Sequence, residues 1–346
     1  MVRKNGITKY RMHFGDAQFL RLAILFIVIL LGVGFSKNWK ILSGPMVNNM
    51  LYQMPEFGLI SLGIMLTRIS GRIDLSVVGT ANLSAIIATL FLRYNFGDTE
   101  KGDIVFVGIL GAFIIALLCG SLCGSLNAFL IYKLDVPAFV ATIGTGTLYS
   151  GIGLIMTKGT TLGGLPHAYQ QLISMRFGFI PLIMLIYILC AIMMAFLLYK
   201  TRFGLNLYLS GTSMLATRYA GINEFSVIFK PYIIAGCMSA LGGMIMLGRF
   251  NSVNVSNGNN YALMGVLICM IGGINPSGGQ GRVENVVMAT LTIQLINSSL
   301  SLFHSINTFY NNIILGGLLI FFMIFNYYID IRQEHQLNKK VDKTAE

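Results

Sequence analysis

The sequence predicts an all-α polytopic membrane protein with about ten transmembrane helices. Hydrophobic residues make up 55% of the 346 residues and charged residues only 11%, whereas about a quarter of the residues in an ordinary soluble domain are charged. Such a chain cannot cover itself with polar surface. Apolar stretches long enough to cross a bilayer, about 20 residues each, recur between residues 20 and 330. These two observations exclude the soluble fold classes.

The apolar stretches give ten candidate spans, each bounded by charged or turn-forming residues. We expect them at 20–36, 46–66, 73–93, 103–131, 137–157, 179–199, 227–249, 260–275, 283–304 and 308–329. The first lacks a small-residue cleavage site, so it is interpreted as a retained helix and not as a signal peptide.

The second span is unusually polar for a membrane segment. It carries Asn48, Asn49, Gln53, Pro55 and Glu56. Polar groups persist at membrane depth only where other helices or water cover them. We therefore expect one broken or re-entrant segment near 46–60.

The basic residues predict the orientation of the chain. If the N-terminus is cytoplasmic, 17 of the 24 Lys and Arg residues lie on the cytoplasmic side, as the positive-inside rule requires. We expect a basic cytoplasmic arm at 1–19, one transmembrane domain at 20–330 and a cytoplasmic tail at 331–346, with both termini inside. The net charge of +11 then reflects topology and attraction to anionic lipid, and not binding to nucleic acid.

The stretch TRISGRIDLS places charges between two apolar runs. Arg68 and Arg72 mark a cytoplasmic turn, in which Gly71 supplies the bend. Asp74 precedes the next span, where a carboxylate can accept backbone N–H bonds at a helix N-terminus. A structural role as a cap and a functional role are equally open for Asp74.

Polar side chains within the spans are candidates for a translocation pathway, because an unpaired amide or hydroxyl in hydrocarbon is unfavourable. These candidates are neutral: Asn82, Asn127, Thr142, Thr145, Gln294 and Asn297. They would suit a monosaccharide or a similar polyol. Hydrogen bonding between helices is the alternative role for each of them. Gly120 and Gly124 form a G-x-x-x-G step that predicts close helix packing.

Nothing in the sequence predicts catalysis or a metal site. His13, His167, His304 and His335 are scattered, and the five cysteines lie in apolar segments without partners at ligand spacing. A membrane enzyme is therefore disfavoured. A proton-coupled secondary carrier would need an acidic residue within a span, and Glu56 is the nearest candidate.

Four blocks resemble one transporter family. SGRIDLSVVGTANLSAIIATL (residues 70–90), VPAFVATIGTGTLYSGIGLIMTKG (136–159), TRFGLNLYLSGTSMLATRYAGI (201–222) and IGGINPSGGQGR (271–282) are similar, in order and spacing, to segments of the permease subunits of ABC importers. These importers carry ribose, xylose, galactose, arabinose or autoinducer-2, within the branched-chain amino acid and sugar permease superfamily. The resemblance covers residues 45–329.

The resemblance implies an ABC importer permease in a bacterial plasma membrane, with several partners. These are an ABC ATPase subunit, a second permease that is either an identical or a related chain, an extracytoplasmic sugar-binding protein and membrane lipid, but no nucleic acid. The chain has no G-x-x-x-x-G-K-[ST] motif, so it would bind no cofactor itself and ATP would be used by the partner subunit. Nucleosides and branched-chain amino acids are the alternative solutes.

The resemblance also assigns roles to two loops. The cytoplasmic loop at about 200–226 would couple to the ATPase through a short helix ended by Gly221; its residues are Gly211, Ala216, Thr217, Arg218, Gly221 and Ile222. An amphipathic helix lying on lipid is the alternative for this loop. Gly278, Gly279 and Gly281 would form a turn.

The sequence departs from the family pattern at three places. Ser70 replaces the first Gly of a Gly-Gly pair, Thr217 replaces an Ala, and Ala262 and Met264 stand where acidic residues are expected. These departures weaken any transfer of the solute's identity and leave the fold assignment unchanged.

Overall fold

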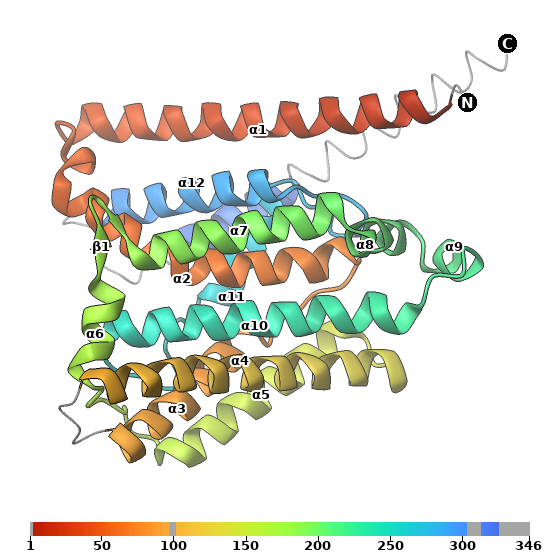
Figure 1. Cartoon of the computed structure of the whole chain (residues 1–346). Coiled ribbons are helices and arrows are strands. Elements are labelled where there is room, and N and C mark those ends of the chain that lie inside the picture. The colour runs from red at the N-terminus through yellow and green to blue at the C-terminus, as the bar shows by residue number, and fades with distance from the viewer. Residues whose placement is uncertain (1–2, 97–101, 303–312, 325–346) are drawn as a thin grey trace, which may run out of the picture.

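A computed structural model describes residues 3–96, 102–302 and 313–324, which are almost entirely helical (Figure 1). The helices are α1 (Arg3–Ser36), η1 (Lys40–Leu42), α2 (Gly44–Ile69), α3 (Val77–Phe96), α4 (Gly102–Lys133), α5 (Ala138–Thr157), α6 (His167–Ser174), α7 (Leu182–Lys200), α8 (Arg202–Thr212), α9 (Met214–Tyr219), α10 (Glu224–Phe250), α11 (Tyr261–Ile271) and α12 (Val283–Ser301). Strands β1 (Arg176–Phe177) and β2 (Ile180–Pro181) form one short antiparallel hairpin. A further helix covers Ile313–Ile324.

The all-α membrane class is confirmed, and each expected span overlaps a helix. Among the described residues, six helices are long and apolar enough to cross a membrane, namely those at Gln18–Ser36, Val77–Phe96, Val105–Lys133, Ala138–Thr157, Leu182–Lys200 and Glu224–Phe250. α1 begins at Arg3, so helix extends into the basic arm at 1–19. The ends of the expected spans at 283–304 and 308–329, and the tail at 331–346, lie outside the described residues.

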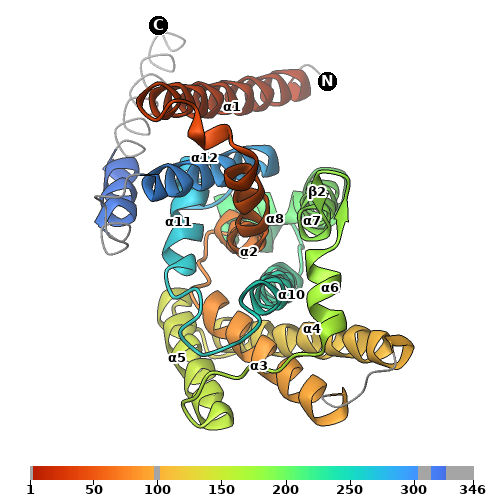
Figure 2. The ribbon, with the colours of Figure 1, turned by 90° about the vertical axis from the view of Figure 1, so that its left-hand side faces the viewer.

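The expected break near 46–60 is wrong, because α2 runs without interruption from Gly44 to Ile69. Pro55 lies inside the helix and removes only one backbone donor. The polar side chains that suggested a break have partners on other helices: Gln53 bonds to Gln294, and Glu56 bonds to Arg249. Every residue of α2 from Met54 onward is buried, so α2 is the central helix of the bundle (Figure 2).

α10 packs directly against α2, α3 and α4. A Cβ atom added to Gly236 would lie 2.0 Å from the carbonyl oxygen of Gly120, and one added to Gly124 would lie 2.1 Å from that of Tyr232. α4 and α10 therefore touch through their backbones, as small residues allow in membrane helices. Gly243 makes a similar approach to Ala81 of α3.

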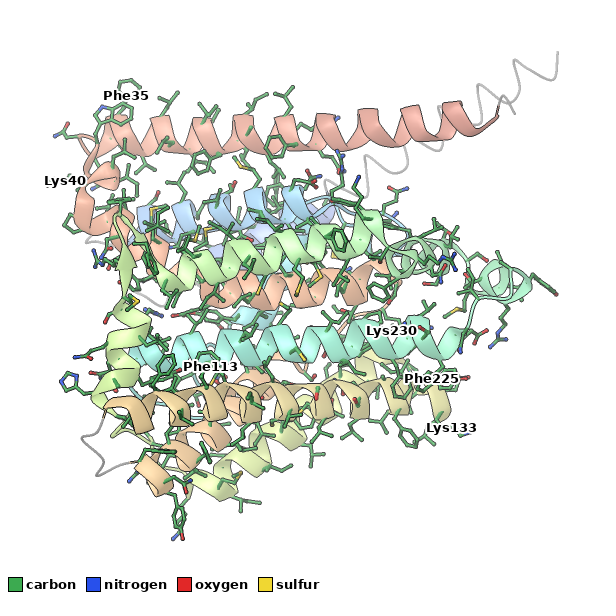
Figure 3. The ribbon with its side chains drawn as sticks, viewed as in Figure 1. Phe35, Lys40, Phe113, Lys133, Phe225 and Lys230 are labelled. Atoms are coloured by element: carbon green, nitrogen blue, oxygen red, sulfur yellow. The ribbon has the colours of Figure 1, made fainter. Side chains whose placement is uncertain are left out.

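The bundle has two distinct ends, which we name after the short helices that they carry. At the α9 end lie α8, α9 and the side chains of Lys133, Phe225 and Lys230 (Figure 3). At the α6 end lie α6, the β1–β2 hairpin, Phe35 and Lys40. Between the ends, α4 exposes apolar side chains at regular helical spacing, at Phe106, Leu110, Ile114, Leu118 and Leu122. Such a face suits contact with hydrocarbon.

Candidate functional site

α9 is a short helix that stands out from the α9 end of the bundle. The Ser213 hydroxyl accepts a hydrogen bond from the backbone N–H of Ala216 at 3.2 Å and caps the helix. Gly221, with a φ of 71°, lies in the left-handed region that glycine adopts without strain. Leu215 and Tyr219 are 61% and 85% exposed. The helix therefore presents a partly apolar surface that no other described element covers.

One ion pair ties α9 to the start of α10. The guanidinium of Arg218 donates to both carboxylate oxygens of Glu224, with Nη2 and Oε2 3.0 Å apart. The hydrogen bond to Glu224 raises the pKa of Arg218 above its usual range. Since the Arg218 side chain is 65% exposed, the pair orients α9 and adds little stability.

A cleft of about 470 Å³ opens beside this ion pair. Its lining combines apolar and charged side chains: Arg72, Ile131, Tyr132, Lys133, Asp135, Met214, Arg218, Glu224 and Ile228. Burial lowers the pKa of Arg72, which stands in the linker between α2 and α3. The cleft thus offers both charges and apolar surface next to α9.

The glycines expected in turns also gather at the α9 end. Gly71, Gly278, Gly279 and Gly281 have φ angles of 76°, 89°, 75° and 150°. Gly71 lies in the α2–α3 turn, and the other three lie in the α11–α12 turn. Gly211, near the end of α8, packs against both turns. The blocks at 70–90 and 201–222 therefore meet the block at 271–282.

Asp74 lies in the extended segment that precedes α3. Its Oδ1 accepts hydrogen bonds from the backbone N–H and the hydroxyl of Ser76, at 2.9 and 2.7 Å. Asn127 of α4 donates to that hydroxyl at 2.7 Å, and Thr145 of α5 donates to the Asn127 amide oxygen. Asp74 is only 2% exposed, and among the described residues no cation pairs with it.

The six candidate pathway residues take part in three separate groups of contacts. Asn127, Thr142 and Thr145 lie near Asp74, with Thr142 bonded to its own helix at Ala138. Asn82 donates to the carbonyl oxygens of Val255 and Asn257 and so holds the α10–α11 loop.

The third group lies on α12. Gln294 donates to Gln53 and to Ser298, while Asn297 contacts the sulfur of Met264. Of the candidate pathway residues, Asn82 and Gln294 each have a buried amide oxygen without a hydrogen-bond partner in the described part of the chain. Each group thus ties a membrane helix to another helix or to a connecting segment.

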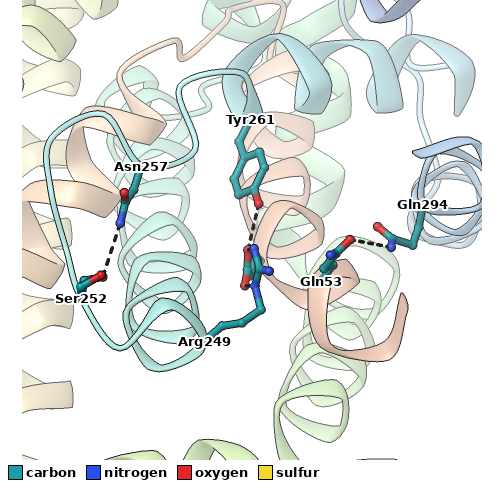
Figure 4. Close-up of polar contacts among 7 residues, drawn as sticks. Gln53, Arg249, Ser252, Asn257, Tyr261 and Gln294 are labelled. Carbon is teal, nitrogen blue, oxygen red and sulfur yellow. Dashed lines mark hydrogen bonds and ion pairs between the residues drawn. The ribbon is translucent and has the colours of Figure 1, made fainter. Parts of the chain in front are cut away.

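Glu56 is the centre of a charged cluster at the α6 end of the bundle (Figure 4). Its side chain is fully buried and accepts two hydrogen bonds from Arg249 of α10, with Nη2 and Oε2 3.1 Å apart. Tyr261 of α11 donates a third bond at 2.9 Å. A carboxylate held by a cation and a hydroxyl is compensated, so this cluster joins α2, α10 and α11.

The partners of Glu56 were not predicted from the sequence. Glu56 lies inside the expected span at 46–66 and Arg249 is the last residue of the expected span at 227–249, where charged residues are few. A buried carboxylate requires a partner, so the small number of charged residues in the apolar segments was the signal that could have identified Arg249 as the partner of Glu56. Tyr208, whose hydroxyl donates to the carbonyl oxygen of Gly281 at 2.7 Å, gave no signal in the sequence.

Comparison with known proteins assigns the chain to a family. The family described as "Branched-chain amino acid transport system / permease component" matches residues 46–323. The chain belongs to this family. The autoinducer 2 import system permease protein LsrC of Escherichia coli strain SMS-3-5 is 29% identical over 283 residues, which are 82% of this chain and 79% of LsrC.

A second relative gives the same result. The autoinducer 2 import system permease protein LsrD of Salmonella typhimurium strain LT2 is 27% identical over 265 residues, which are 74% of this chain and 76% of LsrD. No solved structure gives a significant match. The chain is thus a multi-pass membrane permease of an ABC import system and not an enzyme, and such a permease works with an ATPase and a solute-binding protein.

We predict that Glu56→Gln destabilises the protein by about 3 kcal/mol. Breaking a buried ion pair costs about 3–5 kcal/mol, and Arg249, 24% exposed, keeps some contact with water. Glu56→Gln/Arg249→Gln should recover part of the loss. Thermal unfolding of the purified protein measures both effects.

The same substitution in the exposed pair, Glu224→Gln, is the matched control and should cost no more than about 1 kcal/mol. Equal losses for Glu56→Gln and Glu224→Gln would show that the Glu56 cluster does not hold the helices together.

Proposed function

We propose that this permease admits a monosaccharide or a similar small neutral polyol into the cell, driven by its ATPase partner. The observation that carries the proposal is the neutrality of the six candidate pathway side chains. Amides and hydroxyls line the contacts inside the bundle, and Glu56 is compensated by Arg249. Neutral hydrogen-bonding groups match a polyol and disfavour a charged solute. The names of LsrC and LsrD, which specify autoinducer 2, support the same solute class.

In this proposal the chain crosses the membrane ten times and the α9 end faces the cytoplasm, together with both termini. Support comes from the basic residues that lie at this end, in keeping with the positive-inside rule: Arg68, Arg72, Lys133, Lys200, Arg202, Arg218, Lys230 and Arg282. The α6 end then faces outward, toward the solute-binding protein.

α9 receives the ATPase in this proposal. The exposed Leu215 and Tyr219 would contact the partner, and Arg218 would fix the direction of the helix through Glu224. The residues that act in coupling are Gly211, Ala216, Thr217, Arg218, Gly221 and Ile222. Thr217, only 1% exposed, would anchor the helix.

A second permease packs against α5 in this proposal. Gly144, Thr147 and Gly151 lie on one face of α5, where a Cβ atom on either glycine would meet nothing within 4 Å. Small residues at seven-residue spacing let two membrane helices approach closely. Thr142 and Thr145 lie on the opposite, buried side of α5, so the second permease and these two candidate pathway residues would use different faces of the helix.

Asp74 is the residue that supports a second candidate function. A buried carboxylate without a cationic partner could bind and release a proton, as a proton-coupled carrier requires. Glu56 fits this role less well because Arg249 and Tyr261 hold it. Branched-chain amino acids, which the family description names, and nucleosides are the alternative solutes.

We predict that uptake into vesicles containing the permease, its ATPase and its binding protein requires ATP and is insensitive to an imposed pH gradient. Labelled ribose, leucine and adenosine are the probes, and ribose should be accumulated in preference to the other two. Asp74→Asn and Glu56→Gln should leave the dependence on ATP unchanged. Accumulation driven by the pH gradient alone, and lost in Asp74→Asn, would instead establish the carrier.

We predict that Arg218→Glu weakens copurification of the ATPase, because the substitution would set two carboxylates against each other at the start of α10 and turn α9 away from its position. Arg218→Glu combined with Glu224→Arg reverses the pair and should restore binding at least in part. The amount of ATPase recovered with affinity-tagged permease is the measurement. Unchanged recovery with Arg218→Glu would remove α9 from the ATPase contact.

We predict that a photoreactive benzoylphenylalanine placed at Thr147 captures a second permease in intact cells. The same residue placed at Leu189 of α7, which is 68% exposed, is the control for a lipid-facing position. Mass spectrometry of the adduct identifies an identical or a related chain. Capture from Leu189 but not from Thr147 would place the second permease elsewhere.

A further inference from the structure

Three segments that are distant in the sequence meet in backbone contact at the α9 end. They are the end of α8, the α2–α3 turn and the α11–α12 turn. A Cβ atom added to Gly211 would lie 2.0 Å from the carbonyl oxygen of Ile69 and 2.3 Å from the backbone nitrogen of Gly279. One added to Gly278 would lie 2.5 Å from the nitrogen of Gly71. No side chain larger than hydrogen fits at these contacts.

Two hydrogen bonds fasten the same segments. The backbone N–H of Gly279 donates to the carbonyl oxygen of Ile69 at 2.9 Å, which joins the α11–α12 turn to the end of α2. The hydroxyl of Tyr208 donates to the carbonyl oxygen of Gly281 at 2.7 Å, which joins α8 to the same turn. We call this three-way contact of Gly71, Gly211, Gly278 and Gly279, with its two bonds, the glycine joint.

The glycine joint differs from the other attachment of α9. Arg218 and Glu224 connect α9 to α10 through long side chains, one of them 65% exposed, which can rotate before they transmit a displacement. The glycine joint has no side chain between the backbones, and backbones in van der Waals contact cannot approach further. α9 begins at Met214, three residues after Gly211. A displacement of α9 is therefore transmitted to α2 and the start of α12 with little loss.

We infer that Gly211 is a positioning residue through which movement of α9 reaches α2 and α12. This inference rests on the proposed function, in which the ATPase moves α9. α2 is continuous and buried along most of its length, and its far half carries Gln53 and Glu56. α12 carries Gln294, which bonds to Gln53. A displacement at the joint thus acts on polar contacts at the opposite end of the bundle.

The test uses the assembled importer, with permease, ATPase and binding protein, in lipid nanodiscs. Spin labels on Asn49→Cys of α2 and Tyr94→Cys of α3, in a chain without its native cysteines, report the distance between the two helices at the α6 end. This distance is recorded without nucleotide and with ATP and vanadate. We expect it to change in the otherwise unaltered chain.

Gly211→Ala should abolish this change, because a Cβ atom there forces the three backbones of the joint apart. Gly32→Ala is the matched control, since a Cβ atom there meets nothing within 4 Å, and it should behave as the parent. If Gly211→Ala fails to assemble, Tyr208→Phe is the variant that tests the joint, because it removes one hydrogen bond of the joint without adding volume. Tyr208→Phe should reduce the change in the distance between α2 and α3.

The outcomes separate the two proposals. An ATPase that does not copurify with the parent chain, or a parent chain whose helices do not respond to ATP, would overturn the proposed function. A parent chain that responds, together with a Gly211→Ala or Tyr208→Phe chain that responds equally, would overturn the role of the joint alone.

Discussion

Direct contact between helix backbones is the constraint on which the rest of the structure depends. At Gly120, Gly124 and Gly236 the side chains are absent, so α4 and α10 lie as close as their carbonyl oxygens permit. α10 then reaches α2 and α3 on its other faces. In a bilayer the hydrophobic effect does not drive helices together, so close packing and hydrogen bonds supply the stabilisation. The positions of Asp74, Glu56 and the glycine joint all follow from this packing.

Hydrogen bonds between buried polar groups also hold the helices together. Each region of polar side chains joins helices that are distant in the sequence: Glu56 joins α2 to α10 and α11, Asn127 joins α4 to α5 and to the segment before α3, and Gln294 joins α12 to α2. An unpaired polar group in a low-dielectric interior is costly, and a paired one fixes a unique arrangement. These bonds are therefore structural, although the amide oxygens of Asn82, Asn285 and Gln294 are buried without a hydrogen-bond partner in the described part of the chain.

The sequence could predict the helices because hydrophobic length and charge boundaries are local properties. It could also predict α9, since Gly221 is a local stop signal. It could not predict that Glu56 pairs with Arg249, 193 positions away, and for that reason the polar start of α2 was interpreted as a break. The Gly120–Gly124 step predicted a packing face but not α10 as its partner, because any membrane helix with small residues would satisfy the same pattern. The six neutral residues expected along a pathway stay a prediction, and their bonding partners on other segments could not be read from a linear pattern.

The contrast between α9 and the glycine joint has a consequence for how this transporter can evolve. Substitutions at Leu215 or Tyr219 change a surface that touches nothing else in the described chain, so they are nearly free of structural consequence. Substitutions at Gly211 or Gly279 require three backbones to separate. If α9 receives the ATPase as proposed, selection can adapt the chain to a different ATPase by changes on α9 while the contacts of the glycine joint stay the same. A pair of duplicated permeases could diverge in their ATPases before their helix bundles diverge.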